Sequence, residues 1–323
     1  MRRGLKLLMM LLAGLGTSGA VTAQDYPTRP IRLVVPFAPG GGTDLLARTV
    51  AQKLNEAWGQ PVVVDNRPGG TGAVGSVLVA QSAPDGYTLI LVTSSTHAIA
   101  PNFHRKPPYD PVKDFAPIAL IASAPEIVVA HPSVPATSIK ELVALAKAKP
   151  NTLNYASAGT GTIGNMTGEL FKITTGADIT HVPYKGTGAA VRDLLGGQVQ
   201  IMFSAPGAVI QLVRSGKLRA LGSATRQRLP ELKEISTLAE SGYPAVEASN
   251  WYAVLATAGT PNAVINKLNH EIVHTMQLAE VKELLLRQGY EAITSTPEEL
   301  ASLIKNDLAK WAKVVKAAGM QID

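Results

Sequence analysis

The chain has 323 residues, of which 46% are hydrophobic and 17% charged, and its formal net charge is +6. This composition excludes a disordered or fibrous protein and suffices for two lobes of roughly 150 residues each. No cysteine occurs, which excludes disulfides and a lipid anchor on cysteine. Because no basic cluster with interleaved aromatics is present, nucleic acid is not an expected partner.

Residues Met1–Ala23 have the features of a cleavable signal peptide. Arg2, Arg3 and Lys6 form a basic start, the apolar run Leu7–Leu15 follows, and small residues end the segment. The apolar run is shorter than the roughly 20 residues that a membrane-spanning helix needs. Removing the three basic residues leaves 27 basic against 24 acidic ones, a net charge of +3. We expect an exported, periplasmic protein.

The stretch Ile31–Arg48 predicts a strand, a glycine turn and the start of a helix. The apolar run Ile31–Phe37 is typical of a buried strand, and it ends before three consecutive glycines, Gly40–Gly42. Thr43 and Asp44 offer N-cap chemistry for the helix. A glycine turn at a helix N-terminus directs unpaired N–H groups and the positive end of the helix dipole at an anion.

Strands and helices alternate along the rest of the chain. Strands are predicted at Pro61–Arg67, Tyr87–Ser95, Ile118–His131 (interrupted at Pro125), Leu153–Ala158, Ile179–Tyr184, Val199–Ser204, Leu218–Ala224 and Trp251–Thr257. Helices are predicted at Gly69–Gln81, Ser138–Lys149, Thr162–Thr175, Thr187–Leu195 and Ala208–Arg214, and from Pro261, Ala279 and Pro297 onward. This alternation predicts α/β architecture with mostly parallel sheets covered on both faces.

Four predicted strand-to-helix turns carry glycines: Pro39–Asp44, Pro68–Gly75, Ala158–Gly164 and Lys185–Gly188. In open α/β sheets, ligands bind beyond the carboxyl ends of the strands, where these turns lie. Two sheets that each present glycine amides could hold one small anion between them. The alternative interpretation is that the glycines only allow tight turns and close packing of helix on sheet.

Two glycine patterns match the glycine part of the dinucleotide-binding fingerprint but lack its acidic residue. Gly70–Gly75 and Gly159–Gly164 both read G-x-G-x-x-G and each follows a predicted strand. The fingerprint also needs an acidic residue about 20 positions later to bind the ribose. The next strands end in Thr93-Ser94-Ser95 and Tyr184-Lys185 instead. Nicotinamide dinucleotide binding is therefore not expected.

The segment His270–His274 matches the zinc-protease pattern H-E-x-x-H. At helical periodicity, Ile265, Leu268 and Ile272 form the buried stripe, which places His270 and His274 on the solvent side. No third histidine ligand follows. An exported zinc-dependent hydrolase using His270 and His274 is therefore the alternative function, while no metal, cofactor or catalytic residue is the main expectation.

Several longer motifs carry a resemblance to a known family. They are VPFAPGGGTDLLAR, VVVDNRPGGTGAVGS, APDGYTLILVTSSTHAIAPN, PYDPVKDFAPI, LNYASAGTGTIGNMTGELF, HVPYKGTGAAVRDLLGGQV, GKLRALGSAT and WYAVLATAGTP. With these motifs in order along the mature chain, the protein resembles the Bug-type solute-binding receptors of tripartite tricarboxylate transporters. The resemblance implies a monomeric two-lobed clamshell of the periplasmic-binding-protein type. It implies no enzymatic activity.

The resemblance also implies where a ligand and partners would bind. The first lobe would comprise residues 24–125 and 249–323 and the second 126–248, with hinges near Ile121–Ile127 and Glu247–Trp251. The ligand would be a di- or tricarboxylate or an aromatic acid, passed to membrane permease subunits or to a sensor domain. The implied ligand-binding residues are Phe37, Gly41, Gly42, Asp44, Ser94, Thr96, His97, Ser157, Gly159, Thr160, Gly161, Thr162, Asn165 and Ser204.

Two of these positions depart from the family pattern. Asn165 stands where the turn G-T-G-T-x-x-H often has histidine, and Ser204 stands where M-F is often followed by aspartate. Because an acid at the second position would pair with an ammonium group, its absence predicts a simple carboxylic acid rather than an amino acid as the ligand.

Overall fold

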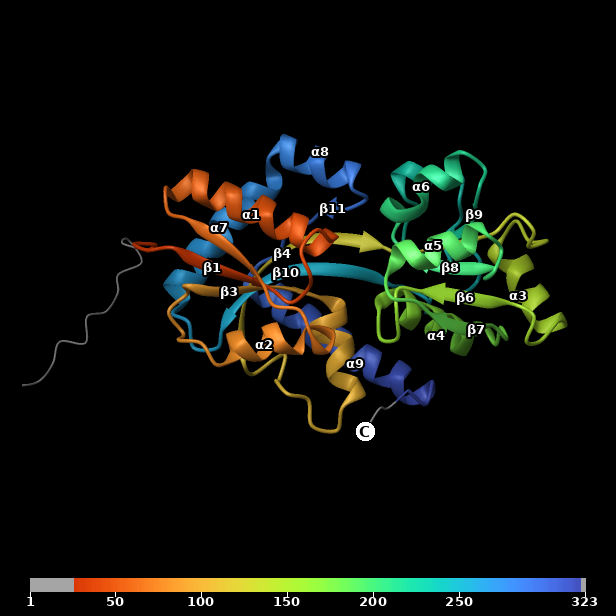
Figure 1. Ribbon diagram of the computed structural model, residues 1–323, viewed down its shortest axis with the longest axis horizontal. Helices are drawn as coiled ribbons and strands as arrows, with labels where there is room; N and C mark the ends of the chain where they lie inside the picture. The colour runs from red at the N-terminus through yellow and green to blue at the C-terminus, as the bar shows by residue number, and fades with distance from the viewer. Residues whose placement is uncertain (1–25, 321–323) are drawn as a thin grey trace, which may run out of the picture.

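The structure is a computed structural model that describes residues 26–320, so the predicted signal peptide lies outside the described residues. Two β-sheets, each with helices on both faces, lie side by side and form two lobes (Figure 1). The predicted elements are confirmed, with strand ends that differ by one to three residues, except that the run Ile118–His131 forms two strands. Within residues 26–320, no helix combines the length and apolar character that a membrane crossing requires.

The first lobe is built on a six-stranded sheet with the order β11-β4-β10-β3-β1-β2. Its strands are β1 (Ile31–Val35), β2 (Val62–Asn66), β3 (Thr88–Thr93), β4 (Phe115–Pro125), β10 (Ser249–Thr257) and β11 (Glu291–Ala292). One face packs against α1 (Gly42–Trp58), α7 (Asn262–Gln277) and α8 (Ala279–Arg287). The other face packs against α2 (Ala73–Ala80) and α9 (Pro297–Ala317). Alternate side chains of the central strands enter two separate cores, so these strands are apolar throughout.

The second lobe is built on a five-stranded sheet with the order β7-β6-β8-β5-β9. Its strands are β5 (Ile127–Ala130), β6 (Asn154–Ser157), β7 (Thr180–Pro183), β8 (Ile201–Ser204) and β9 (Arg219–Ser223). Helices α3 (Ile139–Ala148) and α4 (Ile163–Thr175) cover one face, and α5 (Thr187–Leu195) and α6 (Pro206–Arg214) cover the other. The expected cap of α3 forms, since Ser138 Oγ accepts from the N–H of Glu141 at 3.3 Å.

Short helical turns complete the described elements: η1 (Gly70–Gly72), η2 (Ser95–Ile99), η3 (Ala100–Phe103) and η4 (Pro230–Leu232).

Most strands of each sheet run in one direction, as predicted, but each sheet also contains reversed strands. In the first lobe β1 pairs in parallel with β2 and β3, whereas the β10–β3, β10–β4 and β11–β4 pairs are antiparallel. In the second lobe β6 is parallel to β7 and β8, whereas β5 is antiparallel to β8 and β9. Strands β5 and β10 are reversed because each begins where the chain enters its sheet from the other lobe, at the edge where the parallel strands end.

The chain passes between the sheets at two adjacent places. On the way out, Glu126 joins β4 to β5; on the way back, Ala248 precedes β10. The two crossings are hydrogen-bonded, since the N–H of Glu126 donates to the carbonyl of Ala248 at 3.2 Å. Helix α9 also contacts both lobes, packing on β4 and on α4 (Figure 1). Lys310 of this helix donates to the Glu247 carbonyl at 2.5 Å.

Candidate functional site

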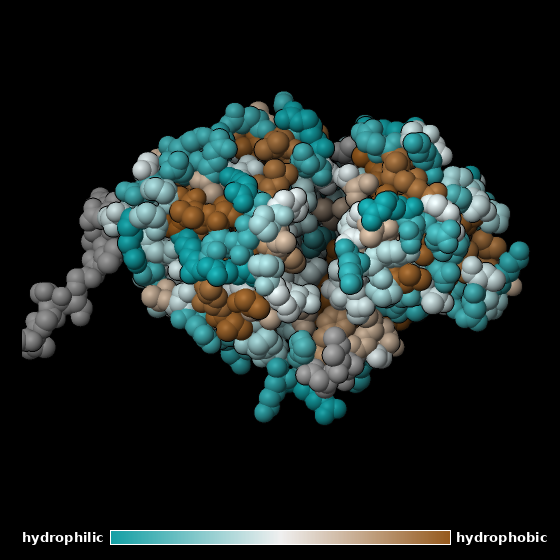
Figure 2. All heavy atoms as spheres, viewed as in Figure 1, coloured by the Kyte–Doolittle hydropathy of each residue, from teal (hydrophilic) through white to brown (hydrophobic). Residues whose placement is uncertain are grey.

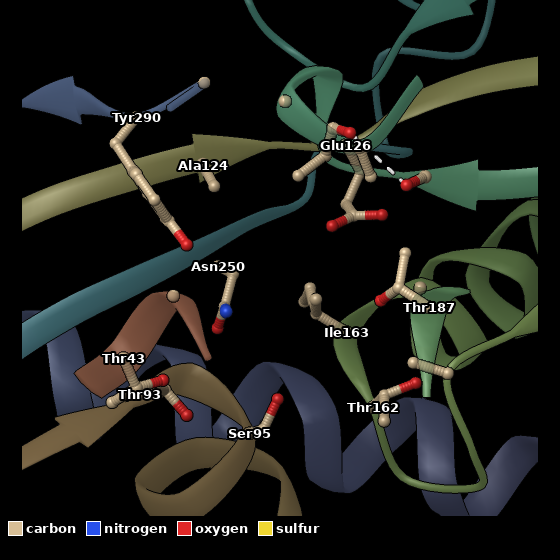
Figure 3. A pocket seen from close by; sticks show the side chains of 18 of the residues that line it. Thr43, Thr93, Ser95, Ala124, Glu126, Thr162, Ile163, Thr187, Asn250 and Tyr290 are labelled. Atoms are coloured by element: carbon tan, nitrogen blue, oxygen red, sulfur yellow. Dashed lines mark hydrogen bonds between the residues drawn. The ribbon is translucent and has the colours of Figure 1, made fainter. Parts of the chain in front are cut away.

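A cavity of about 350 Å³ lies where the two lobes face each other. The space-filling view shows the groove between the lobes, and the close-up shows the cavity itself (Figures 2 and 3). Its walls include the carboxyl ends of β3, β4 and β8 and the turns that follow β1 and β6. This is the edge of the sheets at which the sequence predicts a ligand.

Four helices direct their N-terminal ends at the cavity. Its lining includes Gly42 and Thr43 at the start of α1, Thr162–Gly164 at the start of α4, Thr187 at the start of α5, and residues 205–208 at the start of α6. The first backbone bonds of α1 and α4 begin at Leu45 and Met166, so the N–H groups preceding them have no acceptor within the helix. Since the described lining contains no lysine, arginine or histidine, backbone amides and helix dipoles supply its positive potential.

The first glycine turn is held by Asp44. Its carboxylate accepts from the N–H of Gly40 at 3.0 Å, from the Asn66 amide at 3.0 Å and from the Arg48 guanidinium at 2.9 Å. The hydrogen bond from Arg48, with those from Gly40 and Asn66, lowers the pKa of Asp44 to about 2. The Asp44 side chain therefore fixes the turn, and its carboxylate faces protein donors rather than the cavity.

The second glycine turn is held by Asn165 and Ser157. The N–H of Gly161 donates to Asn165 Oδ1 at 3.0 Å, and the N–H of Gly159 donates to Ser157 Oγ at 3.1 Å. Both side chains are fully buried. Asn165 thus holds the glycine turn at the start of α4, so that the N-terminus of this helix faces the cavity. The Asn165 side chain itself does not line the cavity.

At the end of β3, only alternate residues reach the cavity. Thr93 and Ser95 line it, whereas Ser94 and Thr96 are buried in hydrogen bonds to protein groups. His97 is also buried, with its ring 4.7 Å from that of Phe115, and burial lowers its pKa to about 3. Neutral His97 therefore contributes to the core of the first lobe.

Asn250 and Tyr252 of β10, together with Tyr290, form part of the cavity wall on the side of the first lobe. Asn250 accepts from Ser94 Oγ at 2.7 Å and donates to the Tyr252 hydroxyl at 2.7 Å. The ring of Tyr290 packs edge-on against that of Tyr252, with 5.3 Å between centroids. A Cβ atom on Gly42 would lie 1.7 Å from the Tyr290 hydroxyl, so this position requires glycine to let the phenol approach the start of α1.

Glu126 contributes the carboxyl group in the cavity. It is 2% exposed, and its Oε2 atom has no hydrogen-bond partner. Figure 3 shows the carboxyl group pointing into the space between Asn250, Ile163 and Thr187. Burial raises the pKa of Glu126 to about 8, because the charged form loses its hydration there.

The structure brings only some of the predicted site residues to the cavity. Those that line it are Phe37, Gly42, Thr162 and Ser204. Those that do not are Gly41, Asp44, Ser94, Thr96, His97, Ser157, Gly159, Thr160, Gly161 and Asn165. Most of the second group hold the turns that shape the cavity, so a direct contact of these side chains with a ligand stays a prediction that the geometry does not favour.

Among the cavity-lining residues that the sequence analysis did not name, Glu126 is one whose sequence context is unusual. It is the single charged residue between Ile118 and Ala130, an otherwise apolar run. A charge in a buried strand needs a reason. Asn250, Tyr252, Thr187 and Tyr290 had no such signal, because each is an ordinary residue whose position only the folded chain defines.

The H-E-x-x-H segment lies on α7, and no residue of this helix lines the cavity. His270 and His274 are exposed, while Leu268 and Ile272 face the core, as the helical periodicity predicts. Within residues 26–320, no group of three or more acidic, histidine or cysteine residues is placed to hold a metal ion.

Two α/β lobes, two adjacent crossings and a cavity lined by helix N-termini define a two-lobed periplasmic binding protein. Residues 46–320 match the model of the tripartite tricarboxylate transporter family receptor. The chain belongs to this family and is a solute-binding receptor.

Relatives and solved structures agree with this assignment. The chain is 38% identical to Protein BugT of Bordetella pertussis, covering 100% of this chain and 99% of that protein. The structure of R. palustris Rpa4515 with adipate is 37% identical, with a TM-score of 0.80 over 91% of this chain and 99% of that one. MatC (Rpa3494) from Rhodopseudomonas palustris with bound malate is 32% identical, with a TM-score of 0.77 over 90% and 100%.

Proposed function

We propose that the cavity binds a small carboxylic acid, whose carboxylate is held by the amides at the starts of α1 and α4. The observation that carries the proposal is the convergence of four helix N-termini on a cavity without a basic side chain. An anion is the ligand that such a cavity stabilises. The adipate and malate in the two related structures support a carboxylate, and 350 Å³ suits a molecule of that size.

The hydroxyls of Thr43, Ser95 and Thr187 would add hydrogen bonds to this carboxylate from both lobes. Each belongs to a residue that lines the cavity, and they stand around it in Figure 3. Hydrogen bonds to an ionised group are stronger than neutral ones. A ligand that bridges these donors would therefore stabilise the closed arrangement of the lobes.

The division into lobes at residues 125/126 and 248/249 is part of the proposal. It is supported by the position of Glu126 and Ala248 between the two sheets. Two close approaches cross the cleft and support a closed state: a Cβ atom on Gly289 would lie 2.3 Å from Gly207 Cα, and one on Gly161 would lie 2.9 Å from the Phe103 ring. Hinge closure around a ligand excludes water and strengthens its hydrogen bonds.

The same proposal covers the partners. The loaded receptor would act as a monomer in the periplasm, reached through the predicted signal peptide, and deliver its ligand to the permease subunits of a tripartite transporter. Family membership supports this delivery. The proposed function needs no cofactor or catalytic residue, and the exposed His270 and His274 give the alternative of a zinc hydrolase no support.

A thermal-shift screen with carboxylic acids, followed by calorimetry, tests the proposal. A binding acid should raise the melting temperature by mass action, without turnover and without sensitivity to chelators. Thr187→Val should weaken binding about tenfold, the effect of losing one hydrogen bond to a charged group. Thr180→Val, on the exposed side of β7, is the matched control. Binding of no carboxylic acid, or conversion of the acid to a product, would contradict the proposal.

A further inference from the structure

The carboxyl group of Glu126 is buried without a protein partner. The residue lies at the crossing from β4 to β5, is 2% exposed, and has an Oε2 atom without a hydrogen bond. Leaving a carboxyl group buried and unpaired costs stability. A buried, unpaired ionisable group that lines a cavity is a candidate for contact with a ligand.

No charged group of the described lining can neutralise Glu126. The other titratable residues of the lining are the phenols Tyr252 and Tyr290, and burial raises the pKa of both, so both stay neutral. Lys310, near the second crossing, donates to a backbone carbonyl of Glu247 instead. Thus the cavity contains one unpaired acid and, at its helix N-termini, an excess of positive backbone potential.

Strand register places Glu126 beside Ser204. Ile127 of β5 pairs with Ser204 of β8, so the residue before Ile127 lies next to the end of β8. Both Glu126 and Ser204 line the cavity. The acid that the sequence motif lacks at Ser204 is therefore supplied from the neighbouring strand. The expectation of a simple carboxylic acid rested on the absence of an acid at this place.

We propose that Glu126 pairs with a cationic nitrogen of the ligand, so that the receptor selects carboxylic acids that also carry an ammonium group. The proposal rests on the proposed function and names its substrate class. In such a complex the ligand carboxylate lies at the helix N-termini and its ammonium lies at Glu126. Each charge then meets the opposite charge, and the buried acid gains its partner.

A dicarboxylic acid satisfies the same cavity less well. Its second carboxylate could meet Glu126 only while Glu126 keeps its proton, because no lysine, arginine or histidine in the described lining offsets the charge of two carboxylates. Such a complex forms only with a shared proton, as in other pairs of close carboxyl groups. Charge complementarity therefore favours the ammonium-bearing ligand.

The test is calorimetry at pH 7 with straight-chain acids of three to six carbons. Each chain length is measured as the unsubstituted acid, as the α,ω-dicarboxylate, and as the amino acids with the ammonium at carbon 2 or at the last carbon. At least one amino acid should bind more than tenfold tighter than the unsubstituted and dicarboxylic acids of its length. This panel also covers the ligand class of the proposed function.

Two variants test whether the Glu126 carboxylate causes the preference for amino acids. Glu126→Gln keeps the shape of the side chain and should weaken amino-acid binding at least tenfold, and by a larger factor than it weakens binding of the unsubstituted acid. Adding Ser204→Asp to Glu126→Gln returns an acid to the same side of the cavity and should recover most of the lost affinity. Circular dichroism and melting curves establish that each variant is folded.

The outcomes separate the two proposals. Dicarboxylates or unsubstituted acids that bind at least as tightly as every amino acid would overturn the selection of an ammonium group. An amino-acid affinity unchanged by Glu126→Gln would overturn it too. If no acid of any series binds the unmodified protein, the proposed function itself fails, and the selectivity that rests on it fails with it.

Discussion

The two glycine turns, one in each lobe, use the same local geometry. In the first, the N–H of Gly40 donates to Asp44 Oδ2 at 3.0 Å; in the second, the N–H of Gly161 donates to Asn165 Oδ1 at 3.0 Å. In both, the acceptor lies four residues after the glycine, within the first turn of the following helix. Each side chain thereby fixes the direction in which its helix N-terminus faces the cavity.

The turns differ in the charge of that side chain, and their surroundings explain the difference. Asp44 has the Arg48 guanidinium at 2.9 Å, so an ionised acceptor is paired. Asn165 is fully buried, and its amide donates to Tyr155 Oη at 3.0 Å, while Tyr155 itself donates to Glu169 at 2.6 Å. A carboxylate there would lack a cation and the donor that Tyr155 requires. The local motif tolerates either residue; the neighbours select one.

The largest expected effect is on stability, when Asn165 of the second turn is replaced by the aspartate found in the first. Asn165→Asp should lower the free energy of unfolding at pH 7 by about 3 kcal/mol, because it buries an unpaired charge. The loss should shrink in mildly acidic solution as the new carboxyl group becomes neutral. Urea denaturation at pH 7 and pH 5 measures both. Equal stability of the variant and the unmodified protein at pH 7 would show that the two turns are interchangeable.

The reciprocal change, Asp44→Asn, should lower the free energy of unfolding by about 1 to 2 kcal/mol at pH 7, since it removes a hydrogen bond between charged groups. The pKa of Asp44 is lowered from 3.8 to about 2. Its contribution is therefore present above pH 4 and is lost as the pH falls toward 2. The stability difference between variant and unmodified protein should vanish over that interval in denaturant titrations. A difference independent of pH would assign the loss to packing instead.

The contact between Gly207 and Gln288, which crosses the cleft, should affect affinity more than stability. A Cβ atom on Gly207 would lie 2.3 Å from the backbone oxygen of Gln288, so Gly207→Ala should hold the cleft partly open. We expect an affinity loss of about tenfold, or 1.4 kcal/mol, with a change in melting temperature of at most about 1 to 2 degrees (about 0.5 kcal/mol). Gly188→Ala, whose Cβ atom meets nothing within 4 Å, is the control. Similar affinity of both variants would exclude this contact from closure.

The smallest effect is expected within the first turn itself. Gly41 is exposed, has an extended φ of −85°, and has open space around its Cβ position. Gly41→Ala should therefore change affinity less than twofold. Gly42→Ala must displace the Tyr290 hydroxyl and should weaken the binding free energy by about 1 kcal/mol. Calorimetry on both variants compares them, and a larger loss at Gly41 would mean that its amide, rather than that of Gly42, meets the ligand.

Much of the fold follows from local patterns in the sequence. Ile31–Val35 and Thr88–Thr93 are strands because uninterrupted apolar runs suit strands buried on both faces. Ser138 begins a helix because its hydroxyl accepts from the N–H of Glu141. The position of the cavity at the glycine turns was likewise predictable, since it depends on where strands end and helices begin.

Strand direction and the identity of the lining residues were not predictable in this way. The reversal of β10 depends on where the chain re-enters the first sheet, which no local pattern encodes. His97 and Ser95 belong to one polar turn, but only the packing of Phe115 decides that His97 is buried and Ser95 lines the cavity. A motif identifies a turn; it does not identify which of its side chains point outward.

The sequence by itself determined the α/β architecture and the two glycine turns, because periodicity, capping and glycine conformations act over a few residues. The tertiary structure alone decided that Asp44 and Asn165 hold the turns rather than line the cavity. It also placed Glu126 beside Ser204. The physical reason is that burial and charge pairing depend on neighbours from distant parts of the chain, which come together only when the two lobes meet.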